Sequence, residues 1–118
     1  MKPKCWFMDN RINSWLEDVE RSIDEIFDFL PEQRDFFVYQ KDLKTKKAVE
    51  RNIEIIGEAI NRILKYKHSE IEIKNAQKII GTRNRIAHEY DSISDEVIWT
   101  IIIKELPELK KEINELKK

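Results

Sequence analysis

Residues 42–64 read DLKTKKAVERNIEIIGEAINRIL in one-letter code and form the longest regular pattern in the chain. Its apolar side chains recur three or four residues apart, the spacing that places them on one face of an α-helix. Members of this stripe are Leu43, Val49, Ile53, Ile56, Ile60 and Ile63. The stretch therefore predicts an amphipathic helix that begins near Asp42, fades at residues 66–69 and buries its apolar face against other helices.

A second helix is predicted upstream of this stretch. It begins after residues 9–10, either of which is a suitable N-cap, and carries apolar residues at helical spacing as far as Leu30. Pro31 ends it, because a proline disfavours helical geometry at the residue before it. Residues 35–39 are predicted to form a short aromatic connector between the two helices.

Two more helical segments are predicted downstream. The first runs from about Ile73 toward His88, and Gly81 inside it indicates a position where a close neighbour needs space. The second begins at Ser94, which suits an N-cap, and we expect Pro107 to bend it. Together the segments predict an all-α protein, an antiparallel four- to five-helix bundle.

The composition agrees with this prediction. A chain of 118 residues corresponds to about one domain, so we expect a single domain over residues 1–118. A hydrophobic fraction of 41% can close a core. The chain contains only two glycines and three prolines, which argues against a β-sandwich, a barrel or a glycine-rich phosphate loop.

Charge and cysteine content restrict the function classes. The formal net charge is −1, so the chain lacks the overall positive charge of a non-specific nucleic-acid binder, and phosphate recognition would need a local site. The single cysteine, Cys5, cannot form an internal disulfide or a zinc site alone. The apolar run 97–103 is far too short to span a bilayer, and residues 1–4 begin no signal peptide. We therefore expect a cytoplasmic protein without a membrane segment.

Residues 81–90, GTRNRIAHEY, concentrate the reactive side chains of the chain. Asn84 and His88 share a helix face, whereas Arg83 and His88 lie roughly 140° apart around a regular helix. Three arrangements would let one ligand meet both: a helix that ends or distorts between them, a far-reaching Arg83, or a second protomer. The structural alternative is a histidine that caps the helix C-terminus beside solvated arginines.

Glu50, Glu54 and Glu58 form a like-charge row at four-residue spacing on the predicted helix 42–64. One interpretation is a solvated ladder whose ends Lys46 and Arg62 neutralise. A second is that Glu54 or Glu58 faces the next helix and pairs with Arg83 or Arg85. A carboxylate metal site that includes His88 is a third, although the set of ligands is thin. His68 is predicted to lie on the surface, and Phe36 and Phe37 in the core or a dimer contact.

Residues 83–90, RNRIAHEY, resemble the Arg-x4-His-x-Tyr motif of the HEPN superfamily, specifically its HepT-like toxin branch. Residues 50–59, ERNIEIIGEA, resemble the family's second-helix segment, and residues 95–99, DEVIW, its helix after the motif. The resemblance extends from about Asp9 onward and keeps every position of the motif.

The resemblance implies a function in detail. It implies a toxin of a toxin–antitoxin pair that acts as a homodimer, with the motifs of both protomers lining a cleft that cuts RNA without a metal or other cofactor. The implied partner is a minimal nucleotidyltransferase antitoxin (MntA-like) that silences the toxin by attaching AMP to Tyr90.

The motif residues suit these roles. Histidine, with an unperturbed pKa near 6.5, suits His88 as general base or acid, and the arginine fork suits Arg83 as phosphate ligand. Asn84 would position the phosphate or the histidine, with Arg85, Glu54 and Glu58 in support. Two alternatives stay open: a non-catalytic dimeric module that binds a nucleotidyltransferase and a nucleotide, and a purely structural bundle.

Overall fold

The computed structural model describes residues 10–66, 71–88 and 94–117 of the chain. In these ranges the chain forms α1 (Asn10–Phe29), α2 (Phe36–Lys41), α3 (Leu43–Lys65), α4 (Ala76–His88), α5 (Asp95–Thr100), the π-helix η2 (Ile101–Glu105) and α6 (Leu106–Lys117). No strand occurs in them, so the prediction of an all-α bundle is confirmed.

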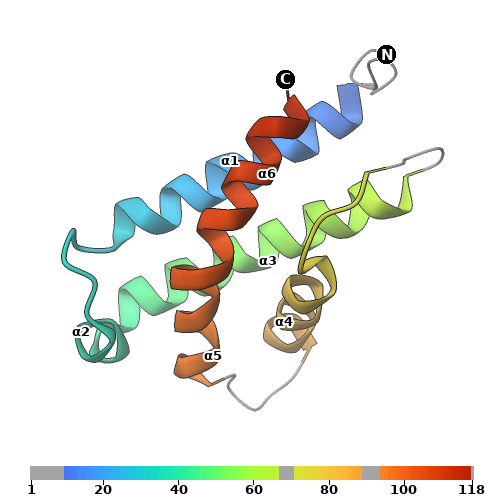
Figure 1. Cartoon of the computed structure of the whole chain (residues 1–118). Coiled ribbons are helices and arrows are strands. Elements are labelled where there is room, and N and C mark those ends of the chain that lie inside the picture. The colour runs from blue at the N-terminus through green and yellow to red at the C-terminus, as the bar shows by residue number, and fades with distance from the viewer. Residues whose placement is uncertain (1–9, 67–70, 89–93, 118) are drawn as a thin grey trace.

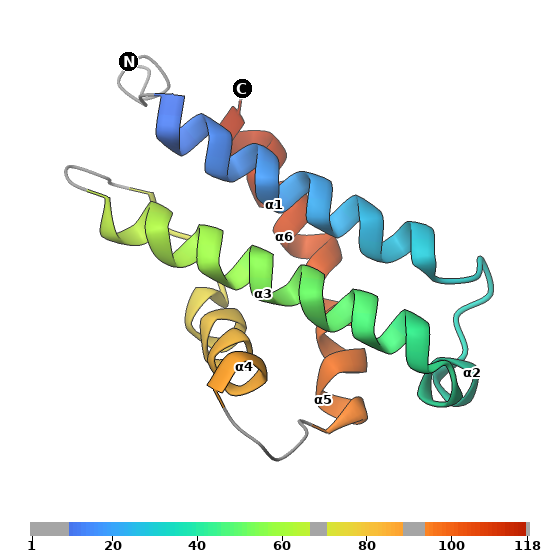
Figure 2. The same cartoon turned by 180° about the vertical axis from the view of Figure 1, so that it is seen from behind.

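The long helices α1 and α3 lie side by side and run in opposite directions (Figure 1). α4 packs against α3, and the continuous segment α5–η2–α6 crosses on one side of the α1–α3 pair. Seen from behind, α1 and α3 lie in front of α6 (Figure 2). The face of α3 that lies between α1 and α4 on this side is therefore not covered by α6.

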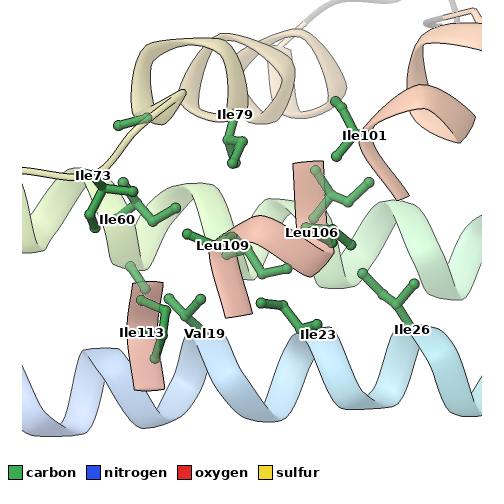
Figure 3. Close-up of a cluster of buried hydrophobic side chains, with 14 of the residues drawn as sticks. Val19, Ile23, Ile26, Ile60, Ile73, Ile79, Ile101, Leu106, Leu109 and Ile113 are labelled. Atoms are coloured by element: carbon green, nitrogen blue, oxygen red, sulfur yellow. The ribbon is translucent and has the colours of Figure 1, made fainter. Parts of the chain in front are cut away.

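Isoleucine dominates the core where these helices meet (Figure 3). The predicted stripe of α3 supplies Ile53, Ile56, Ile60 and Ile63, each fully buried. Leu43 is an exception, because its side chain is 64% exposed. It lies six positions before Val49, which turns it roughly 120° away from the stripe, so its assignment to the buried face was wrong.

The aromatic connector expected at residues 35–39 is mostly a helix, α2. Asp35 caps it by accepting hydrogen bonds from the backbone N–H groups of Phe37 at 2.9 Å and Val38 at 3.3 Å. Asp42 then ends α2 and caps α3, accepting from the backbone N–H of Thr45 at 3.1 Å. Two N-cap aspartates seven residues apart are the sequence signal for this short helix.

The last helical segment begins as predicted, with the Ser94 hydroxyl accepting from the backbone N–H of Glu96 at 3.1 Å. Where a bend was expected at Pro107, the structure has the π-helix η2, which ends two residues before the proline. There the backbone N–H of Leu106 donates to the carbonyl of Ile101, five residues back. Proline has no N–H for an α-helical bond to Ile103 and crowds that carbonyl, which favours a wider turn at this place.

A buried carboxylate joins η2 to the start of α4. Glu105 is 4% exposed; its Oε1 accepts from Asn75 Nδ2 at 2.8 Å, and its Oε2 lies 2.8 Å from Lys78 Nζ. Asn75, directly before α4, has a φ of 63°, a left-handed conformation that asparagine tolerates better than most residues. These contacts hold the first turn of α4 against the C-terminal segment.

None of the helices in the described ranges is long and apolar enough to cross a membrane.

Candidate functional site

Residues 83–88 of the motif predicted from the sequence form the C-terminal end of α4. The helix is unbroken from Ala76 through His88, so the possibility that it ends or distorts between Arg83 and His88 is excluded. The side chain of His88 and the whole of Tyr90 lie outside the described residues. On this regular helix the backbone of His88 remains roughly 140° around the axis from Arg83.

Arg83 extends from α4 to α3. Its Nη2 lies 2.7 Å from Glu58 Oε2, and its Nη1 donates to Asn84 Oδ1 at 3.0 Å. The Arg83 side chain is only 26% exposed. The hypothesis that a glutamate of α3 pairs with a motif arginine is therefore confirmed for Glu58 and Arg83. A guanidinium has five N–H donors, so an ion pair with one carboxylate is compatible with a further contact to a phosphate.

The rest of the glutamate row is divided among several partners. Arg62 Nε donates to Glu58 Oε1 at 3.1 Å, so Glu58 lies between two arginines, and Arg51 lies 3.8 Å from Glu54. Lys46, which the ladder interpretation placed beside Glu50, makes its ion pair with another residue. Its Nζ lies 3.0 Å from Asp95 Oδ2 at the start of α5, because the fold brings these two elements together.

The two glycines of the chain have opposite surroundings. A Cβ on Gly81 would meet none of the described atoms within 4 Å, so the expectation that a close neighbour needs space at Gly81 was wrong. A Cβ on Gly57 would lie 2.4 Å from the Cβ of Arg83 and 2.9 Å from its Cγ. The close approach is therefore at Gly57, where α3 and α4 meet.

A groove of about 410 Å³ opens beside the Glu58–Arg83 pair. α3 forms most of it, α1 contributes one side, and the lining residues are Trp15, Asp18, Arg51, Glu54, Ile55, Glu58, Ala59, Arg62 and Arg83. Three carboxylates and three arginines thus line the groove. The ring of Trp15 packs edge-on against Tyr66, with the ring centroids 5.6 Å apart.

Comparison with known proteins decides the family. Residues 19–116 match the family described as "Ribonuclease HepT-like". The chain belongs to this family. The resemblance carried by the Arg-x4-His-x-Tyr motif is thus confirmed.

Several relatives are similar over most of their length. A "Putative RNase" of Methanocaldococcus jannaschii is 33% identical over 108 residues, which cover 89% of this chain and 86% of that protein. A "Probable ribonuclease HepT" of Thermococcus cleftensis is 33% identical over 109 residues, covering 88% and 94%. A "Putative RNase" of Caldanaerobacter subterraneus is 38% identical over 81 residues, covering 66% and 70%. No solved structure matches the chain significantly.

The other candidate residues of this family member are placed as follows. Arg85 is exposed on α4, and His68 lies outside the described residues. Phe36 packs against the core and Trp99, with ring centroids 5.9 Å apart, whereas Phe37 is 68% exposed. In the described part of the chain, no three histidine, cysteine or acidic side chains are grouped as metal ligands.

A buried hydroxyl lies away from the motif, on α2, where the ring of Tyr39 packs against Trp99 of α5. Tyr39 is 3% exposed, and in the described part of the structure its hydroxyl has no hydrogen-bond partner. Burial first, and then the negative charges of Glu50 and Asp95, raise the pKa of the Tyr39 hydroxyl above its ordinary value. Neither this residue nor Gly57 was recognised as a candidate from the sequence.

Proposed function

We propose that this family member is an endoribonuclease that works without a metal ion and acts as a homodimer, with the C-terminal ends of two α4 helices lining one cleft. The observation that carries the proposal is the ion pair of Arg83 with Glu58 at 2.7 Å. A purely solvated arginine would need no such partner. A braced and partly buried arginine, next to Asn84 and five residues before His88, suits the binding of a scissile phosphate.

The proposed reaction uses the 2′-hydroxyl of RNA as nucleophile. His88 accepts the proton of that hydroxyl, the oxygen attacks the adjacent phosphorus, and the bond to the 5′-oxygen breaks as that oxygen takes up a proton. Arg83 stabilises the charge that develops on the phosphorane, and Asn84 positions the phosphate or the imidazole. Glu58 holds Arg83, while Glu54 and Arg85 have supporting roles.

The experiment measures RNA cleavage by the purified protein and by the variants His88→Ala and Arg83→Ala. Each substitution should lower the cleavage rate by at least about 10²-fold, with the far-ultraviolet circular dichroism unchanged. Cleavage should persist in EDTA. Wild-type rates for His88→Ala would refute the catalytic assignment, and a loss of cleavage in EDTA would favour a carboxylate metal site. An inactive wild-type protein would favour the non-catalytic interaction module.

The homodimer is supported by the helical geometry of α4. Because α4 is regular, Arg83 and His88 of one protomer diverge around its axis, and residues of two protomers can meet one phosphate more easily than residues of one. Light scattering at micromolar concentration should report a dimer. A monomer that still cleaves RNA would refute a shared site.

We further propose that a nucleotidyltransferase antitoxin silences the enzyme by adding AMP to Tyr90. The transfer would join the tyrosine oxygen to the α-phosphate of ATP and release pyrophosphate. The added phosphodiester would lie two residues beyond His88 and compete for the charge of Arg83. Mass spectrometry after incubation with the partner and ATP should find one or more adenylyl groups on the Tyr90 peptide. Tyr90→Phe should escape silencing, and equal inhibition of this variant without added mass would contradict the proposal.

A further inference from the structure

We propose that Gly57 is a positioning residue of the active site, because its missing side chain is what allows Arg83 to reach Glu58. This inference rests on the proposed role of Arg83 in phosphate binding. Gly57 lies inside α3, directly before Glu58, and is buried where α4 packs against α3. The backbone of α3 thus provides a notch for the side chain of Arg83 and, in the next residue, the carboxylate that holds its guanidinium.

The distances make glycine necessary at this place. A Cβ at residue 57 would lie 2.4 Å from Arg83 Cβ, 2.9 Å from Arg83 Cγ and 3.4 Å from the carbonyl oxygen of Ile79. Non-bonded carbon atoms ordinarily approach to about 3.5–4.0 Å. Arg83 Cγ can rotate away, but Cβ cannot, since the backbone of α4 sets its position. An added methyl group would therefore have to move α4 itself relative to α3.

Such a movement would act on the ion pair directly. Relieving the Cβ contact requires a separation of about 1 Å or more at the point where Arg83 leaves α4. The Nη2–Oε2 distance of 2.7 Å has little room for this, because a donor–acceptor distance near 3.6 Å is no longer a hydrogen bond. Misplacement of a catalytic group by about 1 Å can cost on the order of 10²-fold in rate. Gly57→Ala should thus slow RNA cleavage strongly while the protein still folds.

The chain offers a matched control, since its other glycine also lies inside a helix. Gly57→Ala should lower RNA cleavage by about 10²-fold and lower the melting temperature by a few degrees. Gly81→Ala, with no atom of the described residues within 4 Å of the added methyl, should keep wild-type cleavage and raise the melting temperature by about 2–4 °C. A folded Gly57→Ala protein that cleaves RNA at the wild-type rate would overturn the inference.

A double variant separates positioning from general damage. Glu58→Gln keeps the size of the side chain but removes its charge, and alone it should slow cleavage. If Gly57 acts through the Glu58–Arg83 pair, then adding Glu58→Gln to Gly57→Ala should cause little further loss. Independent defects would instead multiply. Multiplicative losses would show that Gly57 affects the fold only, and would overturn the inference.

The contact of residue 57 with Arg83 can also be tested without measuring RNA cleavage. A failure of the proposed function can then be distinguished from a failure of this inference. Gly57→Ala should lower the melting temperature in the wild-type chain but much less in an Arg83→Gly chain, where the two close atoms, Arg83 Cβ and Cγ, are absent. If Gly57→Ala alone does not fold, the double variant with Arg83→Gly should restore folding. An equal decrease in both backgrounds would overturn the inference. Suppose that the wild-type protein cleaves no RNA, and that Gly57→Ala lowers the melting temperature much less in the Arg83→Gly chain than in the wild type. That pair of results would reject the proposed function but keep the contact between Gly57 and Arg83.

Discussion

Substituting Glu105 with glutamine removes a buried negative charge and keeps the size of the side chain. In the wild-type structure this carboxylate lies 2.8 Å from Lys78 Nζ and accepts from Asn75 Nδ2, also at 2.8 Å. A glutamine can keep the bond to Asn75 by its carbonyl oxygen, but its amide then faces the ammonium group of Lys78 with N–H donors. The substitution should therefore break the contact between η2 and the first turn of α4.

The magnitude follows from the burial of the two partners. At 2.8 Å and an effective dielectric constant of about 20, the Coulomb attraction is about 6 kcal/mol, of which desolvation of the carboxylate offsets a large part. A charge-assisted hydrogen bond contributes about 1.5–3 kcal/mol net. Lys78, 51% exposed, regains water when the pair is lost, so we expect Glu105→Gln to cost about 2 kcal/mol. For 118 residues, 1 kcal/mol corresponds to about 4 °C, which gives a decrease in melting temperature of about 8 °C.

Removing the other partner should cost more, because the charge left behind is then buried. Lys78→Met leaves the carboxylate of Glu105, only 4% exposed, without its counter-ion, and we expect a loss of about 3–4 kcal/mol. The exposed pair Lys74–Glu108, with a separation of 3.8 Å, serves as control; Glu108→Gln should cost less than about 0.5 kcal/mol. Thermal unfolding followed by circular dichroism measures all three variants. The reasoning would be refuted if Lys78→Met were milder than Glu105→Gln, or if Glu108→Gln matched Glu105→Gln.

Three further predictions concern stability. Tyr39→Phe removes a buried hydroxyl that has no partner in the described part of the structure, and chemical denaturation should find it about 1 kcal/mol more stable than wild type. Because the pKa of Tyr39 is raised from 10.0, the unfolded chain ionises first, so this advantage should grow as the pH rises above 10. Equal stability of Tyr39→Phe and the wild type at pH 7 would show that the hydroxyl is hydrogen-bonded. The Thr45 hydrogen bonds lower the pKa of the Asp42 carboxyl below its usual value. The stability that Asp42 contributes should therefore be present above about pH 4 and lost as the pH falls through the lowered pKa. Asp42→Ala should abolish that part of the acid dependence of the melting temperature. Leu43→Lys should change stability by less than about 0.5 kcal/mol, whereas Ile53→Ala should cost about 3 kcal/mol, and similar losses for both would show that Leu43 is buried after all.

The helices and the motif follow from the sequence, because both depend on residues close together in the chain. The stripe on α3 predicts the buried isoleucines, since helical periodicity is a local property. The spacing of Arg83, His88 and Tyr90 identifies the family in the same way, and residues 19–116 match that family. Even α2, which was missed, has its signal in the capping aspartates Asp35 and Asp42.

The contacts between helices were decided by the tertiary structure. The sequence left open whether Glu54 or Glu58 pairs with an arginine of α4, and the packing of α4 against α3 selects Glu58 and Arg83. The pairing of Lys46 with Asp95 has the same origin, since no periodic pattern relates residues on two different helices. A glycine is equally unfavourable in any helix, so the sequence could not tell that Gly57 accommodates Arg83 while Gly81 faces open space. That difference depends on where the axes of two helices approach most closely, and only the folded chain defines that point.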